Sequence, residues 1–448
     1  MKKHILNSGA VGMFSTAGLM LVVRVGGTLL TLTYTLLMVG VAPPEEVGRA
    51  FAALSAGFLL SVVASLNIEA GSIRFLPLYF EKERMPDAAG YVKFCRRTVL
   101  VTCCVLMLPA ACVLLWSKGV VDLGPFLISF AAAPIIANGR INSRHGVAMG
   151  RVLRAALPRT LVRPVVMSSF LGIASWQGWS LSAMEIMAAF FVASSLATGL
   201  QWLMIRDAMA FRNEVTPRFD AARDWLPFGL MLSPMLIMNE YMRNLIILTS
   251  GLVLDASDVA RLGISLSMIS ILNFGLNAFD LVFSPKISRA TAGERPAARA
   301  KFLSICGAGK FCALVVGVPV AILLIPKVLA LMGAAYSGIE EMFLVLALIP
   351  ASKAVFGPAS LVLNITGHKR ILFVGALAGA GAIVLGTLLG DHLGGAPGVI
   401  IGVAIAAAAY QALLFGMCRR TTGIDTTVFS VFWERRRAAS SSSSSSSS

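Results

Sequence analysis

The sequence has few charged residues, and this shortage excludes an ordinary soluble domain. Charged side chains make up 13% of the 448 residues, hydrophobic ones make up 57%, and the mean hydropathy is +0.81. A soluble domain carries about a quarter charged residues. Apolar runs of roughly 18 residues or more, long enough to cross a bilayer, recur along the whole chain. The composition therefore predicts an all-α polytopic membrane protein.

Several motifs that signal catalysis or metal binding are also missing. There is no GxxxxGK[ST] phosphate loop, so we expect no ATPase within this chain to drive its activity. There is no HExxH or DxD motif, and the seven cysteines form no CxxC pair, which argues against a metal site or a disulfide framework. The loops expected on the outer face are too short for a catalytic domain. We therefore expect a protein that is not an enzyme and that uses no cofactor.

Cutting the sequence at charges and turn residues predicts twelve spans of about 20 residues each. They lie near residues 13–38, 48–70, 97–116, 123–139, 155–176, 181–204, 225–250, 260–284, 303–325, 340–362, 371–390 and 396–417. With a cytoplasmic N-terminus, the inner segments hold most of the 38 Lys and Arg residues, as cytoplasmic loops usually do. Both termini are thus expected in the cytoplasm. The net charge of +16 is explained by attraction to anionic lipid headgroups, and we expect no binding to nucleic acid.

A short internal repeat divides these spans into two sets of six. When the sequence is shifted by 212 residues, EVGRAFAALS (46–55) lies over DVARLGISLS (258–267). Two sets with equal orientation form a parallel repeat, and such transporters commonly bind substrate between the halves near the midplane. The predicted domains are two six-helix bundles, 1–215 and 216–420, around a central cavity. They are followed by a cytoplasmic tail, 421–448, whose nine terminal serines are expected to be disordered.

Six ionisable residues are selected as candidates for a buried site. Arg24, Glu240, Arg243 and Lys353 are placed well inside spans, and Glu69 and Asp280 nearer the inner ends of theirs. A charge at the centre of a span costs about 2.5–3.5 kcal/mol on insertion scales, so such residues normally face a cavity or a partner. All except Lys353 fall in the first, second, seventh and eighth spans, which correspond under the repeat. We therefore predict that these residues line a cavity that binds the substrate.

Some of these residues allow a second interpretation. Glu240 and Arg243 are three residues apart, hence on one helical face, and are expected to pair with each other. Glu240, or a ligand, is also the natural counter-ion of Arg24, for which a purely structural role is the alternative. Glu69 and Asp280 fit equally well at the level of the lipid headgroups.

Proline and glycine residues mark two further features. Lys353 lies between Pro350 and Pro358 in a segment expected to kink, and its amine would cap carbonyl groups that the kink frees. That role is favoured slightly over contact with a ligand. Three glycine pairs have the GxxxG spacing that predicts close helix packing: Gly375/Gly379, Gly386/Gly390 and Gly398/Gly402.

Residues 24–77 resemble the opening of bacterial polysaccharide-biosynthesis flippases. Their sequence is RVGGTLLTLTYTLLMVGVAPPEEVGRAFAALSAGFLLSVVASLNIEAGSIRFLP. The shared features are an arginine in the first span, an outer loop ending in acid-acid-apolar-Gly-Arg, and a second span leading to apolar-Glu-Ala and Arg-Phe-Leu-Pro. These flippases belong to the multidrug/oligosaccharidyl-lipid/polysaccharide exporter superfamily. The twelve-span layout extends the resemblance over nearly the whole chain.

The resemblance implies a V-shaped pair of six-helix bundles in the bacterial inner membrane. It implies a substrate, an undecaprenyl-pyrophosphate-linked oligosaccharide, that alternating access moves from the cytoplasmic to the periplasmic leaflet for surface polysaccharide biosynthesis. By position, Arg24 is the first candidate to contact the pyrophosphate. Arg243 is the second candidate, although its neighbour Glu240 would neutralise the charge of Arg243. Arginine suits phosphate because its planar fork donates two hydrogen bonds and keeps its proton. No span beyond the twelfth is expected, which favours the O-antigen (lipopolysaccharide) or exopolysaccharide branch.

The alternative function is a cation-coupled multidrug exporter of the same superfamily. Such exporters rely more often on buried acids than on a central arginine, so Arg24 favours the flippase. A membrane-embedded transferase or ligase is disfavoured by the short outer loops. The expected partners are the lipid-linked substrate, membrane lipids and other polysaccharide-assembly proteins. The sequence leaves the energy source open among H+, Na+ and the membrane potential.

Overall fold

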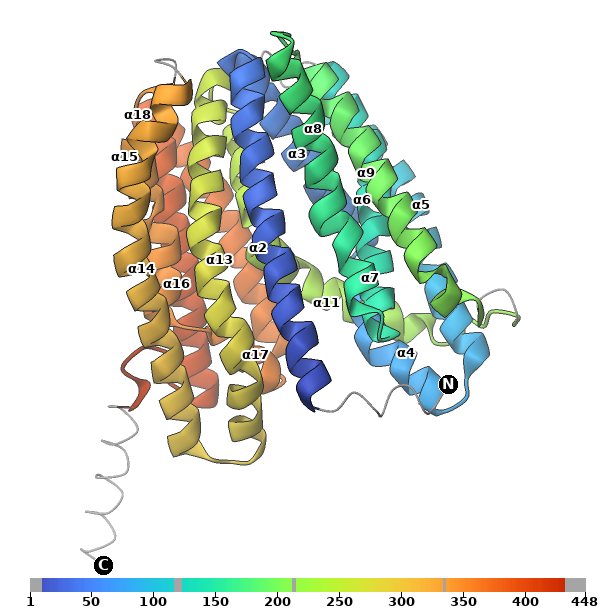
Figure 1. Cartoon of the computed structure of the whole chain (residues 1–448). Helices are drawn as coiled ribbons and strands as arrows, with labels where there is room; N and C mark the ends of the chain where they lie inside the picture. Colours follow the sequence, from blue (N-terminus) through green and yellow to red (C-terminus); the bar gives the residue numbers. More distant parts are fainter. Residues whose placement is uncertain (1–9, 117–122, 212–214, 333–335, 432–448) are drawn as a thin grey trace, which may run out of the picture. The chain divides into compact units, whose positions relative to one another are not determined.

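The computed structural model describes residues 10–116, 123–211, 215–332 and 336–431, and these residues form helices and no strand (Figure 1). The predicted all-α class is confirmed. The chain divides into two compact units, residues 1–260 and 261–448. The predicted six-helix bundles, 1–215 and 216–420, remain a prediction, and the terminal serine tract lies outside the described residues.

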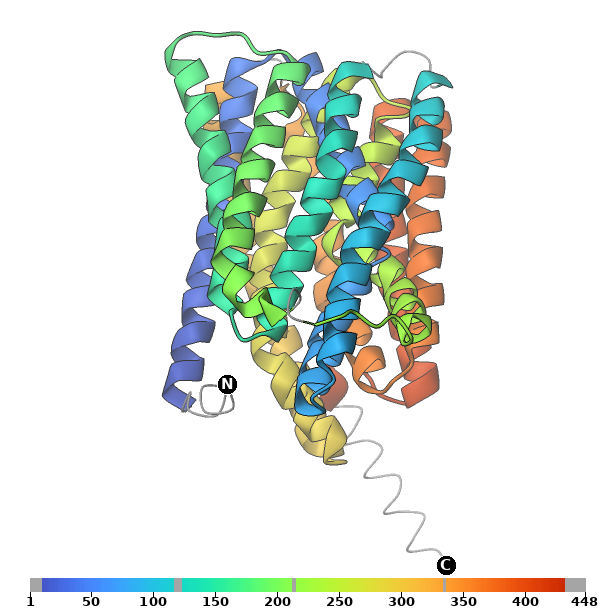
Figure 2. The same ribbon diagram turned by 90° about the vertical axis from the view of Figure 1, so that its right-hand side faces the viewer.

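Unit 1 (residues 1–260) is built from long helices joined by short turns. In chain order its elements are α2 (Ala10–Val41), α3 (Pro44–Ser65), η1 (Ile68–Gly71), α4 (Ser72–Glu81), α5 (Met85–Trp116), α6 (Leu123–Ala148), α7 (Val152–Leu157), η2 (Pro158–Val162), α8 (Arg163–Trp176), α9 (Ala183–Ile205), η3 (Arg206–Met209), α11 (Ala222–Glu240) and α12 (Met242–Ser250). Helix α6 packs against α3, α5 and α9, and α2 packs against α8. Figure 2 shows α5 (blue to cyan), α6 (teal) and α9 (green) side by side.

Local signals in the sequence explain where these helices begin. Helix α3 has Pro44 in its first turn, where a missing N–H costs nothing, followed by Glu45 and Glu46 beside the positive end of the helix dipole. Helix α9 begins with a capping box, in which Ser182 and Glu185 each satisfy a backbone N–H of the other.

An aromatic core holds η1 in unit 1. The indole of Trp225 is fully buried, packs against Tyr91 and donates a hydrogen bond of 2.8 Å to the hydroxyl of Tyr79. Tyr91 in turn donates a hydrogen bond of 2.6 Å to the carbonyl of Ile68 in η1. Burial raises the pKa of Tyr91 well above its ordinary value, so the hydroxyl keeps its proton as a donor. These contacts position Glu69, the next residue of η1.

Unit 2 (residues 261–448) holds most of α13 and the helices that follow it. Its elements are α13 (Ala256–Ala292, whose first five residues belong to unit 1), α14 (Pro296–Met332), α15 (Ile339–Leu346), α16 (Leu348–Phe356), α17 (Ala359–Ile365) and α18 (Lys369–Thr422). The pair α15–α16 and α17 is bent by 45°, which confirms the kink predicted between Pro350 and Pro358. The backbone of α18 leaves helical geometry at Gly394 and Gly395, between the last two predicted spans.

The glycine pairs of α18 pack its two arms closely together. A Cβ atom at Gly386 or Gly390 would overlap the facing backbone at Gly402 and Gly398, respectively. The close packing predicted from the GxxxG spacing is therefore confirmed for these residues.

The helices identify a multi-pass membrane protein. Among the described residues, seven helices are long and apolar enough to cross a bilayer, and the bent pair makes up to eight. The cores of all twelve predicted spans fall on helical residues, but the number of crossings remains a prediction. The first residues of α3 and α13 lie 212 positions apart, which is the offset of the sequence repeat.

Candidate functional site

Arg24 lies near the middle of α2 and its side chain is exposed. It shares one helical stripe with Thr28, Thr31 and Thr35, at spacings of four, three and four residues. The exposed apolar residues of α2, Val22 and Leu29 among them, lie on a different face, roughly 130° around the helix at 100° per residue. Arg24 therefore does not lie on the face of α2 that suits acyl chains. No ion pair of its side chain is found within the described ranges.

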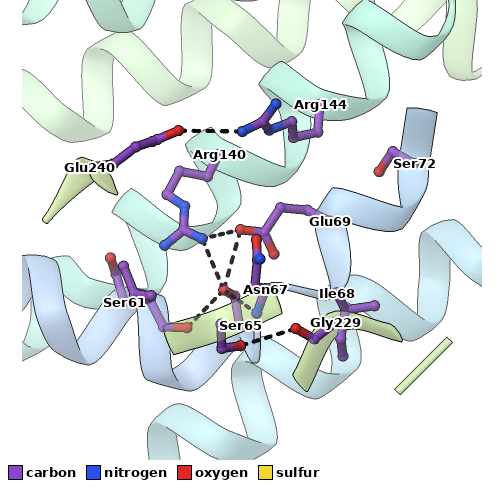
Figure 3. A network of polar contacts seen from close by, with 12 residues as sticks. Ser61, Ser65, Asn67, Ile68, Glu69, Ser72, Arg140, Arg144, Gly229 and Glu240 are labelled. Atoms are coloured by element: carbon purple, nitrogen blue, oxygen red, sulfur yellow. Dashed lines mark hydrogen bonds and ion pairs between the residues drawn. The ribbon is translucent and has the colours of Figure 1, made fainter. Parts of the chain in front are cut away.

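Glu69 is buried in an ion pair with Arg140, a residue of α6 that the sequence analysis did not select (Figure 3). The two side chains are 2% and 5% exposed. The hydroxyl of Ser65 lies 3.3 Å from both Glu69 Oε1 and Arg140 Nη2. The Arg140 guanidinium also lies 5.5 Å from the centre of the Tyr241 ring. The structure therefore favours a buried network for Glu69 over a position among lipid headgroups.

Glu240 forms its ion pair with Arg144 of α6, at 3.6 Å (Figure 3). The expected pairing with Arg243 required one continuous helix through both residues. Helix α11 ends at Glu240 and α12 begins at Met242, because the backbone of Tyr241 departs from helical angles (φ −122°, ψ 12°). The premise of that pairing is wrong.

Two further arginines of unit 1 lie over aromatic rings. The Arg163 guanidinium, at the start of α8, is 5.3 Å and 5.4 Å from the ring centres of Phe58 and Phe190. Arg243 is 5.7 Å from the ring centre of Phe51. Each guanidinium interacts favourably with the negative face of a ring.

Unit 2 contains a second polar cluster. Lys310 of α14 is fully buried, and its Nζ lies 2.5 Å from a carboxylate oxygen of Asp280 on α13. Lys353 donates a hydrogen bond of 2.6 Å to the side-chain oxygen of Asn277, one turn before Asp280. The amine of Lys353 thus contacts a side-chain amide, whereas the sequence predicted backbone carbonyls.

Four of the predicted residues, Arg24, Glu69, Glu240 and Arg243, belong to unit 1, and Asp280 and Lys353 belong to unit 2. The prediction that all six line one central cavity stays a prediction. Sequence analysis did not select Arg140, Arg163 or Lys310 as site residues. Arg163 and Lys310 nevertheless fall within the predicted spans 155–176 and 303–325, and this position was the signal that would have found them.

The pairing of charges determines what unit 1 offers to a ligand. Its two predicted acids, Glu69 and Glu240, have arginine partners from α6. Within the described residues, no ion pair is found for Arg24 or Arg163, and the Nε of Arg163 is buried without a hydrogen bond. The described residues contain no group of three or more His, Cys, Asp or Glu side chains able to hold a metal ion. The arrangement suits an anion held by guanidinium groups.

Comparison with solved structures identifies the fold. A multidrug resistance MATE family transporter of the MOP superfamily, in an inward-facing conformation, matches with a TM-score of 0.67 and 14% identity over 89% of this chain and 97% of its own. The lipid II flippase MurJ, in an inward closed conformation, matches with a TM-score of 0.67 and 13% identity over 89% and 87% of the two chains. The chain has the fold of MOP superfamily transporters.

An outward-facing MATE transporter of the same superfamily matches at a TM-score of 0.57, with 17% identity over 89% of this chain and 94% of that one. No protein-family model matches the sequence, and no curated protein matches it. The fold that the resemblance to this superfamily implied is confirmed. Multidrug transporters and a lipid flippase share this fold, so the substrate has to be argued from side chains.

Proposed function

We propose that the chain is a flippase that moves an undecaprenyl-pyrophosphate-linked oligosaccharide from the cytoplasmic to the periplasmic leaflet of the bacterial inner membrane. The product would serve the synthesis of lipopolysaccharide O-antigen or of an exopolysaccharide. In this proposal twelve spans form two six-helix bundles with both termini in the cytoplasm, and the bundles alternate access to the substrate. The observation that carries the proposal is the arginine of α2, which is exposed on a polar stripe and has no acidic partner among the residues that the structure describes.

The pattern of charge in unit 1 supports a pyrophosphate ligand. Because Glu69 is already neutralised by Arg140, it does not compete with an anionic ligand for Arg24. A guanidinium donates two parallel hydrogen bonds to two phosphate oxygens, and it stays protonated at physiological pH. The cost of placing Arg24 at mid-membrane depth, about 2.5–3.5 kcal/mol, is then offset when the lipid head binds.

The alternative function, a cation-coupled multidrug exporter, is supported by the equal fold similarity to a MATE transporter. An exporter of cationic drugs needs a carboxylate that can receive the cation. The three acids among the predicted site residues have basic partners: Glu69 has Arg140, Glu240 has Arg144 and Asp280 has Lys310. This pairing favours the anionic substrate.

A complementation experiment tests the proposal. The gene is deleted, and wild type, Arg24→Ala, Arg24→Lys and the exposed-site control Arg97→Ala are restored at matched protein levels. A charge-assisted hydrogen bond contributes about 1.5–3 kcal/mol, so Arg24→Ala should reduce surface glycan roughly 10- to 100-fold and cause lipid-linked glycan to accumulate. Arg24→Lys should retain part of the activity, and Arg97→Ala nearly all of it.

Drug tolerance is measured on the same strains. Unchanged tolerance together with lost surface glycan supports the flippase. Full glycan export by Arg24→Ala would refute the proposed role of Arg24. Altered drug tolerance in the deletion strain, with normal surface glycan, would establish the exporter instead.

A further inference from the structure

A pocket of about 360 Å³ opens on the surface of unit 1, over α6 and between α5 and α9. Its lining residues are Arg96, Ile135, Asn138, Asn142, Ser195, Thr198, Gly199 and Trp202. The three helices lie side by side in Figure 2. The volume is at the lower end of the roughly 300–1,000 Å³ that is typical of small-molecule sites. It suits the headgroup of a lipid and is too small for a lipid-linked oligosaccharide.

The pocket lies at the basic end of unit 1. Arg96 is near the start of α5, whereas Asn142 and Trp202 are near the ends of α6 and α9. Other basic residues near the same ends of α5, α6 and α9 are Arg97, Arg144 and Arg206. Basic pockets between membrane helices at the cytoplasmic surface are a recurrent form of lipid headgroup site, and tryptophan is enriched at this depth.

Apolar side chains lie beside the pocket, where acyl chains would be. Leu100 of α5, one turn beyond Arg96, is 56% exposed, and Leu196 of α9 is 54% exposed. The surrounding helix surface is therefore of the kind that contacts lipid. Polar groups on such a surface are costly unless something polar meets them. The pocket thus combines a polar hollow with an apolar surround, as a bound phospholipid requires.

The polar lining has a defined donor and acceptor pattern. Arg96 donates a hydrogen bond of 3.2 Å to the side-chain oxygen of Asn142, which is 3% exposed, so the guanidinium is held at the pocket wall. The hydroxyls of Ser195 and Thr198 donate to backbone carbonyls, at 2.8 Å and 3.4 Å, so their lone pairs remain to accept. Donors for a phosphate oxygen and acceptors for hydroxyl groups therefore line the same hollow.

We infer that this pocket binds an anionic glycerophospholipid of the phosphatidylglycerol type from the surrounding leaflet. The phosphodiester lies by the guanidinium of Arg96 and the amide of Asn142, and the glycerol hydroxyls donate to Ser195 and Thr198. A basic residue that merely extends toward the headgroups would not need a buried asparagine and two hydroxyls beside it. The site is separate from the pyrophosphate role proposed for Arg24 and does not depend on it.

Native mass spectrometry of the full chain in detergent tests the inference. Phosphatidylglycerol and phosphatidylcholine with the same acyl chains are titrated against each variant. Wild type should bind phosphatidylglycerol at least tenfold more tightly than phosphatidylcholine. Arg96→Gln should weaken phosphatidylglycerol binding about tenfold, whereas Arg97→Gln, the same charge change one residue away on an exposed side chain, should stay within twofold.

A second variant fills the pocket without removing charge. A Cβ atom at Gly199 would meet no atom within 4 Å, so Gly199→Leu projects into open space and leaves the helix intact. This variant should also lose about tenfold in phosphatidylglycerol binding. Gly172→Leu, at another uncrowded helical glycine, is the matched control and should bind as wild type does.

The outcomes separate the inference from its alternatives. Equal losses in the Arg96 and Arg97 variants would show diffuse attraction to a basic surface and would overturn the site. Unchanged binding by Gly199→Leu would place the lipid elsewhere. Displacement of phosphatidylglycerol by equimolar undecaprenyl pyrophosphate would assign the pocket to the substrate instead. Arg24→Ala should bind phosphatidylglycerol normally, so this test and that of the proposed function fail independently.

Discussion

The buried ion pair between Glu69 and Arg140 gives the most direct test of the structure. Replacing Glu69 by glutamine keeps the shape of the side chain and removes its charge. Arg140 is then left with a guanidinium that is 5% exposed and has lost its counter-ion. Breaking a buried pair in this way costs about 3–5 kcal/mol of the free energy of unfolding. In a unit of this size, each kcal/mol of lost stability lowers the melting temperature by about 2 °C. The melting temperature should therefore fall by about 6–10 °C.

Tryptophan fluorescence of the full chain in detergent is a suitable measurement. Five of the six tryptophans lie in unit 1: Trp116, Trp176, Trp179, Trp202 and Trp225. Trp225 is fully buried in the aromatic core that holds η1, the element that carries Glu69. The signal therefore reports mainly on the unit that contains the ion pair.

The partner variant Arg140→Gln removes the other charge of the pair. It leaves the Glu69 carboxylate buried without its counter-ion, so this variant should also lower the melting temperature. The double variant should recover at least half of the stability lost by Glu69→Gln, since neither charge remains.

A fall of less than 2 °C for Glu69→Gln would refute the pair, because a solvated Arg140 would not need Glu69. The same conclusion would follow if the double variant were as unstable as the sum of the two single variants. Additivity of that kind means that the two side chains do not interact.

Two further predictions concern the other contacts. In unit 2, Asp280→Asn should lower the melting temperature more than Lys310→Met, because the first leaves a fully buried ammonium and the second a carboxylate that is 26% exposed. In unit 1, Gly48→Leu should abolish the monodisperse peak in size-exclusion chromatography, because a Cβ atom there overlaps the backbone carbonyl of Ala256. Gly40→Leu, where a Cβ meets nothing within 4 Å, is its control and should behave as wild type.

Each of these has a clear contrary result. If Lys310→Met lowers the melting temperature more than Asp280→Asn does, the carboxylate of Asp280 depends on Lys310 more than the ammonium of Lys310 depends on Asp280. A monodisperse, normally melting Gly48→Leu protein would show that the starts of α3 and α13 are not in contact.

The helical elements could be predicted from the sequence because each depends on its own residues. An apolar run of about 20 residues buries its backbone polar groups only as a helix, so charges and prolines mark its ends. The kink before Pro358 and the packing of Gly386 and Gly390 followed from local geometry for the same reason. The repeat also predicted that α3 and α13 begin at corresponding positions.

The partners of the charged side chains were decided by the tertiary structure. Glu69 and Glu240 both meet arginines of α6, Arg140 and Arg144, which are far away in the sequence. The expected Glu240–Arg243 pair required a continuous helix, and the break at Tyr241 removed that condition. Helix formation depends on neighbours along the chain, whereas a buried charge is stabilised by whichever opposite charge the packing brings to it. A sequence therefore reveals which charges need partners, and only the packed helices determine what those partners are.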